Sequence, residues 1–93
     1  MISKEMKSRI EAAEEMLSKR YESVTIGVRR CFRLDDGKII AVGCMGAYNA
    51  LVIEYAESAD EAKMNRFEDG DLFFLDEMDE ETMLSNMLQE ILQ

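Results

Sequence analysis

The chain has 93 residues, of which 47% are hydrophobic and 33% are charged. A chain of this length buries about 65% of its unfolded surface, enough for one small core, so we expect a single domain spanning residues 1–93. It contains no histidine, which removes the commonest general base and the commonest zinc ligand. Its net charge of −9 disfavours direct binding of nucleic acid through a basic surface.

The first 20 residues indicate a cytoplasmic protein that begins with an amphipathic helix. Charged residues occur at once, without the apolar run of a signal peptide, and no stretch of about 18 apolar residues indicates a membrane span. Ser3 is a helix-capping residue, and apolar side chains then recur every three or four positions, at Met6, Ile10, Ala13 and Leu17.

A three-stranded meander is expected next. From Val24 the apolar period changes to two, which predicts one long strand as far as Leu34. The Asp36-Gly37 pair predicts a tight two-residue turn. Further strands follow over 39–45 and 50–55, joined by a turn at 46–49.

The second half adds two helices and a further apolar segment. Ser58 and Glu61 have the spacing of a capping box, which predicts a short helix as far as about residue 64. Residues 65–71 read as a loop and residues 72–75 as a short apolar segment suited to a fourth strand. The last helix starts near Asp79. Its wide apolar stripe consists of Met83, Leu84, Met87, Leu88, Ile91 and Leu92.

These elements define an α+β fold. It has an antiparallel meander of three to four strands between an N-terminal and a C-terminal helix, in the order α-β-β-β-(α)-(β)-α. A two-residue turn at Asp36-Gly37 places Leu34 opposite Ile39 and Phe32 opposite Ala41. One face then carries Val28, Phe32, Leu34, Ile39, Ala41 and Met45, and the other carries Cys31, Ile40, Val42, Cys44, Leu51, Ile53 and Tyr55.

Both faces of this sheet are apolar, so both need a cover. Either the helices cover everything, for example with the terminal helices on opposite sides, or a second copy of the chain covers one face. A homodimer through the sheet or through the C-terminal helix is therefore an alternative architecture.

Charge is distributed unevenly along the chain. Residues 1–46 carry a net charge of +2 and residues 47–93 a net charge of −11. The densest acidic stretch is interleaved with aromatic residues. We expect the partner-binding residues within it to be Glu68, Asp69, Asp71, Phe73, Asp76, Glu77, Asp79 and Glu80.

Four interpretations of this stretch compete. It can be an acidic face that engages a basic groove of a nucleic-acid-binding protein, with Phe67, Phe73 and Phe74 as apolar anchors. It can be merely solvated, with the carboxylates near Asp79 favouring the positive end of the last helix. A divalent-metal site on Asp69, Asp71 and Asp76 departs from the calcium-loop spacing, because Gly70 comes too early. A catalytic pair of carboxylates needs a substrate cleft that so short a chain can scarcely enclose.

Little else in the sequence indicates catalysis. Cys31 and Cys44 have no histidine to activate them, and we expect both to be small buried hydrophobic residues. We expect no cofactor and no metal. Arg29, Arg30 and Arg33 form a basic cluster that we expect to meet carboxylates of the same domain or to lie along an open sheet edge.

A helix, a three-stranded meander and an acidic helical tail resemble, in outline over the whole chain, small phage-encoded anti-CRISPR proteins. That resemblance implies occupation of the DNA-binding groove of a nuclease, and no functional residue is carried over from it. We expect a non-enzymatic module that binds a protein partner with a basic surface and binds no nucleic acid or membrane directly. The alternatives are a homodimeric structural domain with a solvated acidic face, and a divalent-metal or small enzymatic module.

Overall fold

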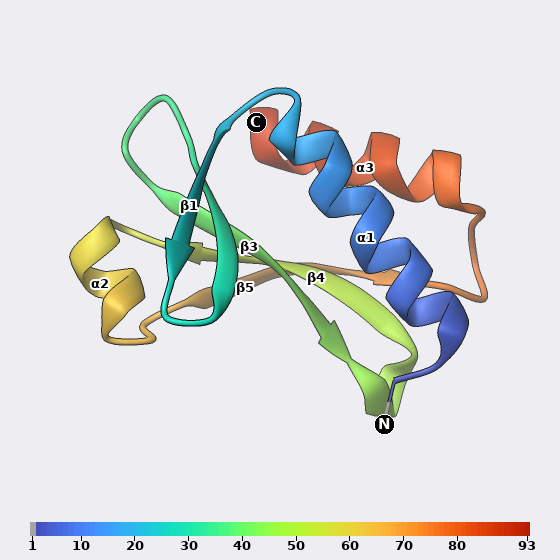
Figure 1. Ribbon diagram of the computed structural model, residues 1–93. Helices are drawn as coiled ribbons and strands as arrows, with labels where there is room; N and C mark the ends of the chain where they lie inside the picture. The colour runs from blue at the N-terminus through green and yellow to red at the C-terminus, as the bar shows by residue number, and fades with distance from the viewer. Residues whose placement is uncertain (1) are drawn as a thin grey trace.

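The computed structural model describes residues 2–93. Five strands form one antiparallel sheet in which every strand pairs with its neighbours in the chain (Figure 1). The elements in chain order are α1 (Lys4–Ser18), β1 (Glu22–Ile26), β2 (Arg29–Arg33), β3 (Ile39–Met45), the 3₁₀ helix η1 (Gly46–Tyr48), β4 (Ala50–Ala56), α2 (Ala59–Lys63), β5 (Glu68–Phe74) and α3 (Glu80–Leu92). The α+β class and the approximate order of elements are confirmed.

Each α-helix starts at the capping residue that the sequence indicates. Ser3 Oγ accepts a hydrogen bond from the Met6 N–H at 3.0 Å, and Ser58 Oγ accepts one from the Glu61 N–H at 3.2 Å. At α3, Asp79 Oδ1 accepts the N–H of Thr82 at 2.8 Å. These bonds satisfy backbone donors that the first turn of a helix leaves free.

The prediction of one long strand from Val24 to Leu34 is wrong, because the chain reverses direction at Gly27 and Val28. Gly27 has a φ of +64°, a conformation that glycine adopts readily. The resulting hairpin pairs Ile26 with Arg29, and Val28 at its tip is fully exposed. The sheet therefore has five strands rather than three or four.

The predicted register between β2 and β3 is also wrong, by one residue. Phe32 lies opposite Ile40 and Arg33 opposite Ile39. The connection has five residues instead of two, since Leu34 lies outside the strand and its N–H donates to the Lys38 carbonyl at 2.8 Å. A one-residue shift exchanges the faces of a strand, so Phe32 shares its face with Ile40 and Val42.

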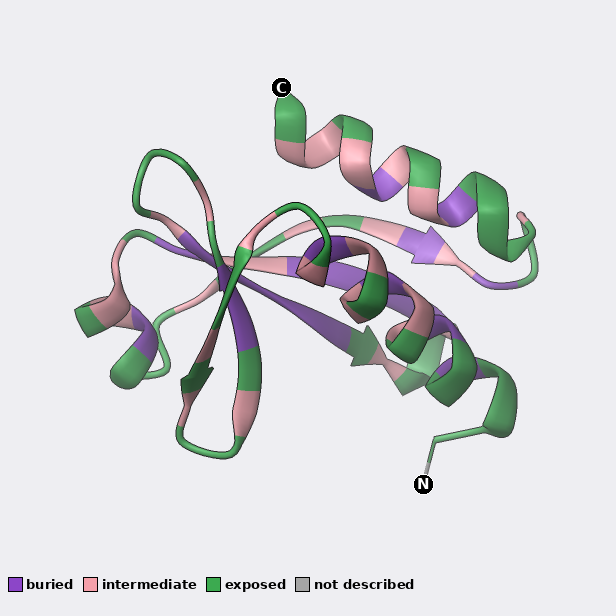
Figure 2. Ribbon diagram, turned by 45° about the horizontal axis from the view of Figure 1, so that its top comes forward, coloured by how far each residue is buried: buried purple, intermediate pink, exposed green. Residues whose placement is uncertain are grey.

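The main core lies between this face and the two terminal helices, which cover the same side of the sheet (Figure 2). Met6, Ala13 and Leu17 of α1 and Met83 and Met87 of α3 are buried there. Their partners on the sheet are Phe32, Ile40, Val42, Leu51, Ile53 and Phe73. Leu88 and Leu92 of the expected stripe lie outside this core: Leu88 is half-buried and Leu92 is exposed.

A smaller core covers part of the opposite face at the end where α2 lies (Figure 1). Ala62 of α2 packs there with Cys31, Ile39, Ala41 and Ala56. The terminal helices are thus not on opposite sides, and the second face is covered in part by α2.

β5 is longer than the sequence suggests and starts at Glu68, inside the stretch expected to be a loop. Its pairing with β4 shifts between Val52 and Glu54, where two residues of β5, Gly70 and Asp71, oppose Ile53. Such a bulge accommodates one extra residue in an antiparallel pair. It places the first half of the acidic stretch on an edge strand of the sheet.

Candidate partner-binding surface

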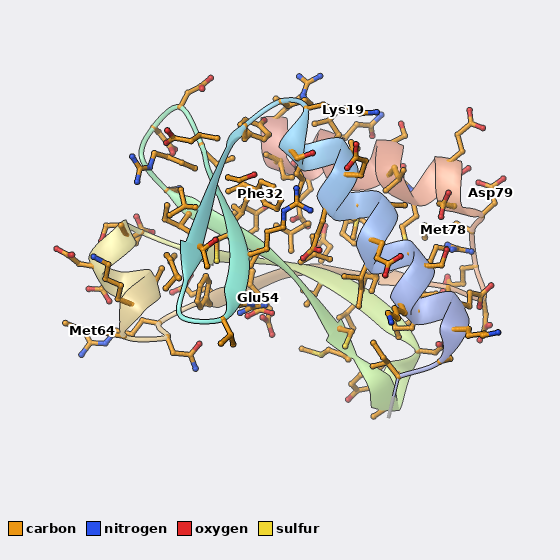
Figure 3. All side chains as sticks on the ribbon, viewed as in Figure 1. Lys19, Phe32, Glu54, Met64, Met78 and Asp79 are labelled. Atoms are coloured by element: carbon orange, nitrogen blue, oxygen red, sulfur yellow. The ribbon has the colours of Figure 1, made fainter. Side chains whose placement is uncertain are left out.

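Seven of the eight predicted site residues lie along one continuous path at the β5 edge of the molecule. Glu68, Asp69 and Asp71 belong to β5, Asp76 and Glu77 to the following turn, and Asp79 and Glu80 to the start of α3. All seven are exposed. Figure 3 labels Met78 and Asp79 where the turn meets α3. We call these seven carboxylates the acidic rim.

Phe73, the eighth predicted residue, does not belong to this surface. Its side chain is 6% exposed and packs in the main core. The alternation of a strand turns Phe73 inward while its neighbours Leu72 and Phe74, both half-buried, point to the other face. The expectation that Phe73 anchors a partner is therefore corrected. Phe67 is also engaged within the domain, because the Arg29 guanidinium lies 5.1 Å from the centre of its ring.

A groove runs between the outer edge of β5 and α3. It has a volume of about 610 Å³. It is lined by residues of β5 and by Met78, by the amide side chains of Asn86, Gln89 and Gln93, and by the carboxylates of Asp71 and Glu90. A groove of this kind brings backbone groups, amides and carboxylates within reach of one ligand.

Glu90 ties α3 to the bulge of β5, a role that sequence patterning missed. Its Oε1 accepts the Asp71 N–H at 2.7 Å, and its Oε2 accepts the Tyr55 hydroxyl. A Cβ at Gly70 would lie 2.5 Å from Glu90 Oε2, so the lack of a side chain there admits the carboxylate. Burial, together with the hydrogen bond to Glu90, raises the pKa of Tyr55. The signal in the sequence was a glycine within the acidic run.

The basic cluster contacts the domain itself, as the sequence suggests. Arg29 forms a two-pronged hydrogen bond with Glu54, with Nη1 3.0 Å from Oε1 and Nη2 bonded to Oε2. This hydrogen bond raises the pKa of Arg29. Arg33 pairs with Glu22 at 3.5 Å, and the exposed Arg30 lies 5.3 Å from the centre of the Phe32 ring.

The two cysteines differ in environment. Cys31 is buried in the smaller core, and burial raises the pKa of its thiol. Cys44 is exposed, contrary to the expectation that both are buried. Neither forms a disulfide.

The structure does not bring Asp69, Asp71 and Asp76 together as a metal site. Within residues 2–93 there is no group of three or more cysteine, aspartate or glutamate side chains arranged to hold a metal ion.

Comparison of the chain with protein-family models, with curated proteins and with solved structures finds no match. Among the helices of residues 2–93, none has the length and apolar character needed to cross a membrane.

Proposed function

We propose that this protein is a small, non-enzymatic, cytoplasmic module that binds a basic groove of a nucleic-acid-binding protein through its acidic rim. The rim carries seven carboxylates in β5, the following turn and the start of α3, and residues 67–93 contain no lysine or arginine. Carboxylates gathered on one surface attract guanidinium and ammonium groups and speed association with a basic partner.

The observation that carries the proposal is that no basic side chain of residues 2–93 forms an ion pair with these carboxylates. Within the described residues 2–93, the ion pairs of acidic side chains involve Glu5, Glu15, Glu22, Glu54 and Glu61, none of which belongs to the rim. The engaged rim carboxylates contact neutral groups: Asp76 accepts from the Asn49 amide, and Asp79 accepts from the Thr82 N–H. The rim carboxylates are therefore not engaged by basic side chains of residues 2–93 and can contact those of a partner.

The test is capture of partners from lysate at low and high salt, followed by mass spectrometry and by measured affinity for each purified candidate. The rim variant replaces Asp69, Asp71, Asp76 and Glu77 with lysine. Its matched control replaces four exposed carboxylates elsewhere, Glu11, Glu15, Asp35 and Asp60, with lysine. Both variants change the net charge equally, so any difference between them reports position.

We expect the wild type and the control variant to bind a nucleic-acid-binding protein at low salt and to release it at high salt, because salt screens exposed charges. The rim variant should fold, as judged by circular dichroism, and should not bind. Equal binding by the rim variant and its control would contradict the proposal. Self-association without a partner, shown by light scattering, would instead favour the homodimeric architecture.

A further inference from the structure

Within residues 2–93, β5 pairs only with β4, so its outer edge is free there. The Leu75 N–H donates to the Asn49 carbonyl at 3.0 Å, in the same register that places Phe74 opposite Ala50 and Leu72 opposite Val52. Hydrogen-bonded and non-hydrogen-bonded pairs alternate in an antiparallel ladder, so the backbone groups of Leu72 and Phe74 point away from β4. The Phe74 carbonyl accepts the Glu77 N–H at 3.2 Å. Both backbone groups of Leu72 and the N–H of Phe74 remain directed into the groove.

This edge is suited to an added strand. A free row of donors and acceptors is a template for pairing with another extended chain. Asn86 and Gln89 of α3 line the groove beside β5, so a chain paired with β5 would lie against them on one side. On its other side it would extend the surface formed by Leu72 and Phe74.

A second copy of this chain is a poor occupant. Antiparallel pairing of two β5 edges brings the start of one strand beside the end of the other, so Glu68, Asp69 and Asp71 of one copy approach Asp76 and Glu77 of the other. Like charges brought together across a pair of strands destabilise the pairing. The acidic rim therefore protects the edge from self-pairing and favours a partner of opposite charge.

We propose that β5 takes up an extended basic segment of the partner as a sixth strand. Lysine or arginine at alternate positions faces α3 and meets Asp71 and Glu90, while the intervening apolar side chains lie beside Leu72 and Phe74. Backbone hydrogen bonds give affinity, and alternate side chains give specificity. This inference rests on the proposed function and specifies how the partner is held.

The first test uses synthetic peptides and the unaltered protein. One peptide alternates lysine and valine, a second is the same peptide with its strand-pairing amides N-methylated, and a third replaces each lysine with glutamate. We expect the first to bind, as measured by calorimetry, with chemical-shift changes at Leu72 and Phe74. N-methylation should weaken binding about tenfold or more through lost hydrogen bonds, and the glutamate peptide should not bind.

The second test uses matched proline variants at the two edges of the sheet. Leu72→Pro removes an outward N–H of β5 without removing a bond to β4, and proline is tolerated at such edge positions. Thr25→Pro makes the same change at the free edge of β1, because Ile26 pairs with Arg29 across the tight turn and leaves the Thr25 N–H pointing outward. We expect Leu72→Pro to lose peptide binding and Thr25→Pro to retain it.

The outcomes separate this inference from the proposed function. Equal affinity for the parent and N-methylated peptides would overturn strand addition and leave charge-based binding intact. If the rim variant and its matched control bound basic proteins equally, the proposed function would fail together with this inference. If the mass of the protein doubled when peptide was added and the resulting dimer contained no peptide, the occupant of the β5 edge would be a second copy of this chain. That outcome would overturn the inference.

Discussion

The ion pair of Arg29 and Glu54 holds the tip of the β1–β2 hairpin against the centre of the sheet. β2 pairs with β3 only at Phe32 and Arg33, so residues before Phe32 depend on side-chain contacts. Arg29 supplies one of these through Glu54 of β4, whose carboxylate lies beside Gly43 of β3. Both charged side chains are partly shielded, with 33% of Arg29 and 20% of Glu54 exposed, so the pair is screened less than one on the open surface.

Substitution of Gly43 tests this arrangement. A Cβ at Gly43 would lie 1.9 Å from Glu54 Oε2, so Gly43→Ala must displace the carboxylate and break its bonds to Arg29. We expect a loss of about 1–3 kcal/mol in the free energy of unfolding, measured with urea. In a Glu54→Ala background the same substitution should cost less than about 1 kcal/mol, because the displaced group is absent.

The matched control is Gly46→Ala, because a Cβ at Gly46 meets no atom within 4 Å. Its cost should be small and equal in both backgrounds. If the costs of Gly43→Ala and Glu54→Ala were additive, the carboxylate would not be the group that the new methyl displaces.

The start of α3 depends on the Asp79 cap, which makes the stability of this helix sensitive to pH. Hydrogen bonds from Thr82 lower the pKa of Asp79 below its ordinary value of 3.8. Because the folded-state pKa is the lower one, the charged carboxylate stabilises the folded protein above the unfolded-state pKa. That contribution disappears as the pH falls through the folded-state pKa.

Asp79→Asn isolates this effect, since asparagine caps a helix without titrating. We expect the stability difference between wild type and Asp79→Asn, measured by urea unfolding, to be constant above about pH 5 and to shift against the wild type at lower pH. Other acidic residues titrate equally in both proteins and cancel from the difference. A difference that does not change with pH would show that the cap does not depend on the charge of Asp79.

Helices were predicted better than strands because their signals are local. The caps Ser3, Ser58 and Asp79 each sit at the expected helix start. Strand number and register depended instead on the lengths of two connections. Gly27 and Val28 form a turn inside a continuous period-two pattern, and the loop after Arg33 has an odd number of residues, so its parity exchanged the faces of β2.

The candidate surface was predictable to the extent that it depends on composition. Exposure of the seven rim carboxylates follows from the cost of burying charge. The inward direction of Phe73 and the contact of Glu90 with the β5 bulge depend on tertiary pairing between segments far apart in sequence. The groove under α3 arises from that pairing, and no local motif marks it.

The molecule as a whole has a strongly uneven charge distribution. Residues 1–46 have a net charge of +2 and residues 47–93 have −11. Four of the nine bases of the first half, Arg9, Lys19, Arg29 and Arg33, each pair with a carboxylate. The rim has no such partners within residues 2–93, so its carboxylates repel one another. Repulsion of this kind destabilises a folded chain and weakens as salt screens it.

Removal of the rim charges should therefore stabilise the protein. We expect the combined substitutions Asp69→Asn, Asp71→Asn, Asp76→Asn and Glu77→Gln to raise Tm at low salt, by an amount that shrinks as salt is added. The corresponding amide substitutions at Glu11, Glu15, Asp35 and Asp60 remove the same charge where bases lie nearby, as in the Glu15–Lys19 pair, and should give no gain. An unchanged or lower Tm for the amide variant of the rim at low salt would mean that the rim carboxylates do not repel one another enough to lower stability and are simply solvated. A gain in Tm confined to the amide variant of the rim, together with its loss of partner binding, would mean that the same four carboxylates lower stability and supply the contact. A loss of stability in return for function is expected of a binding surface.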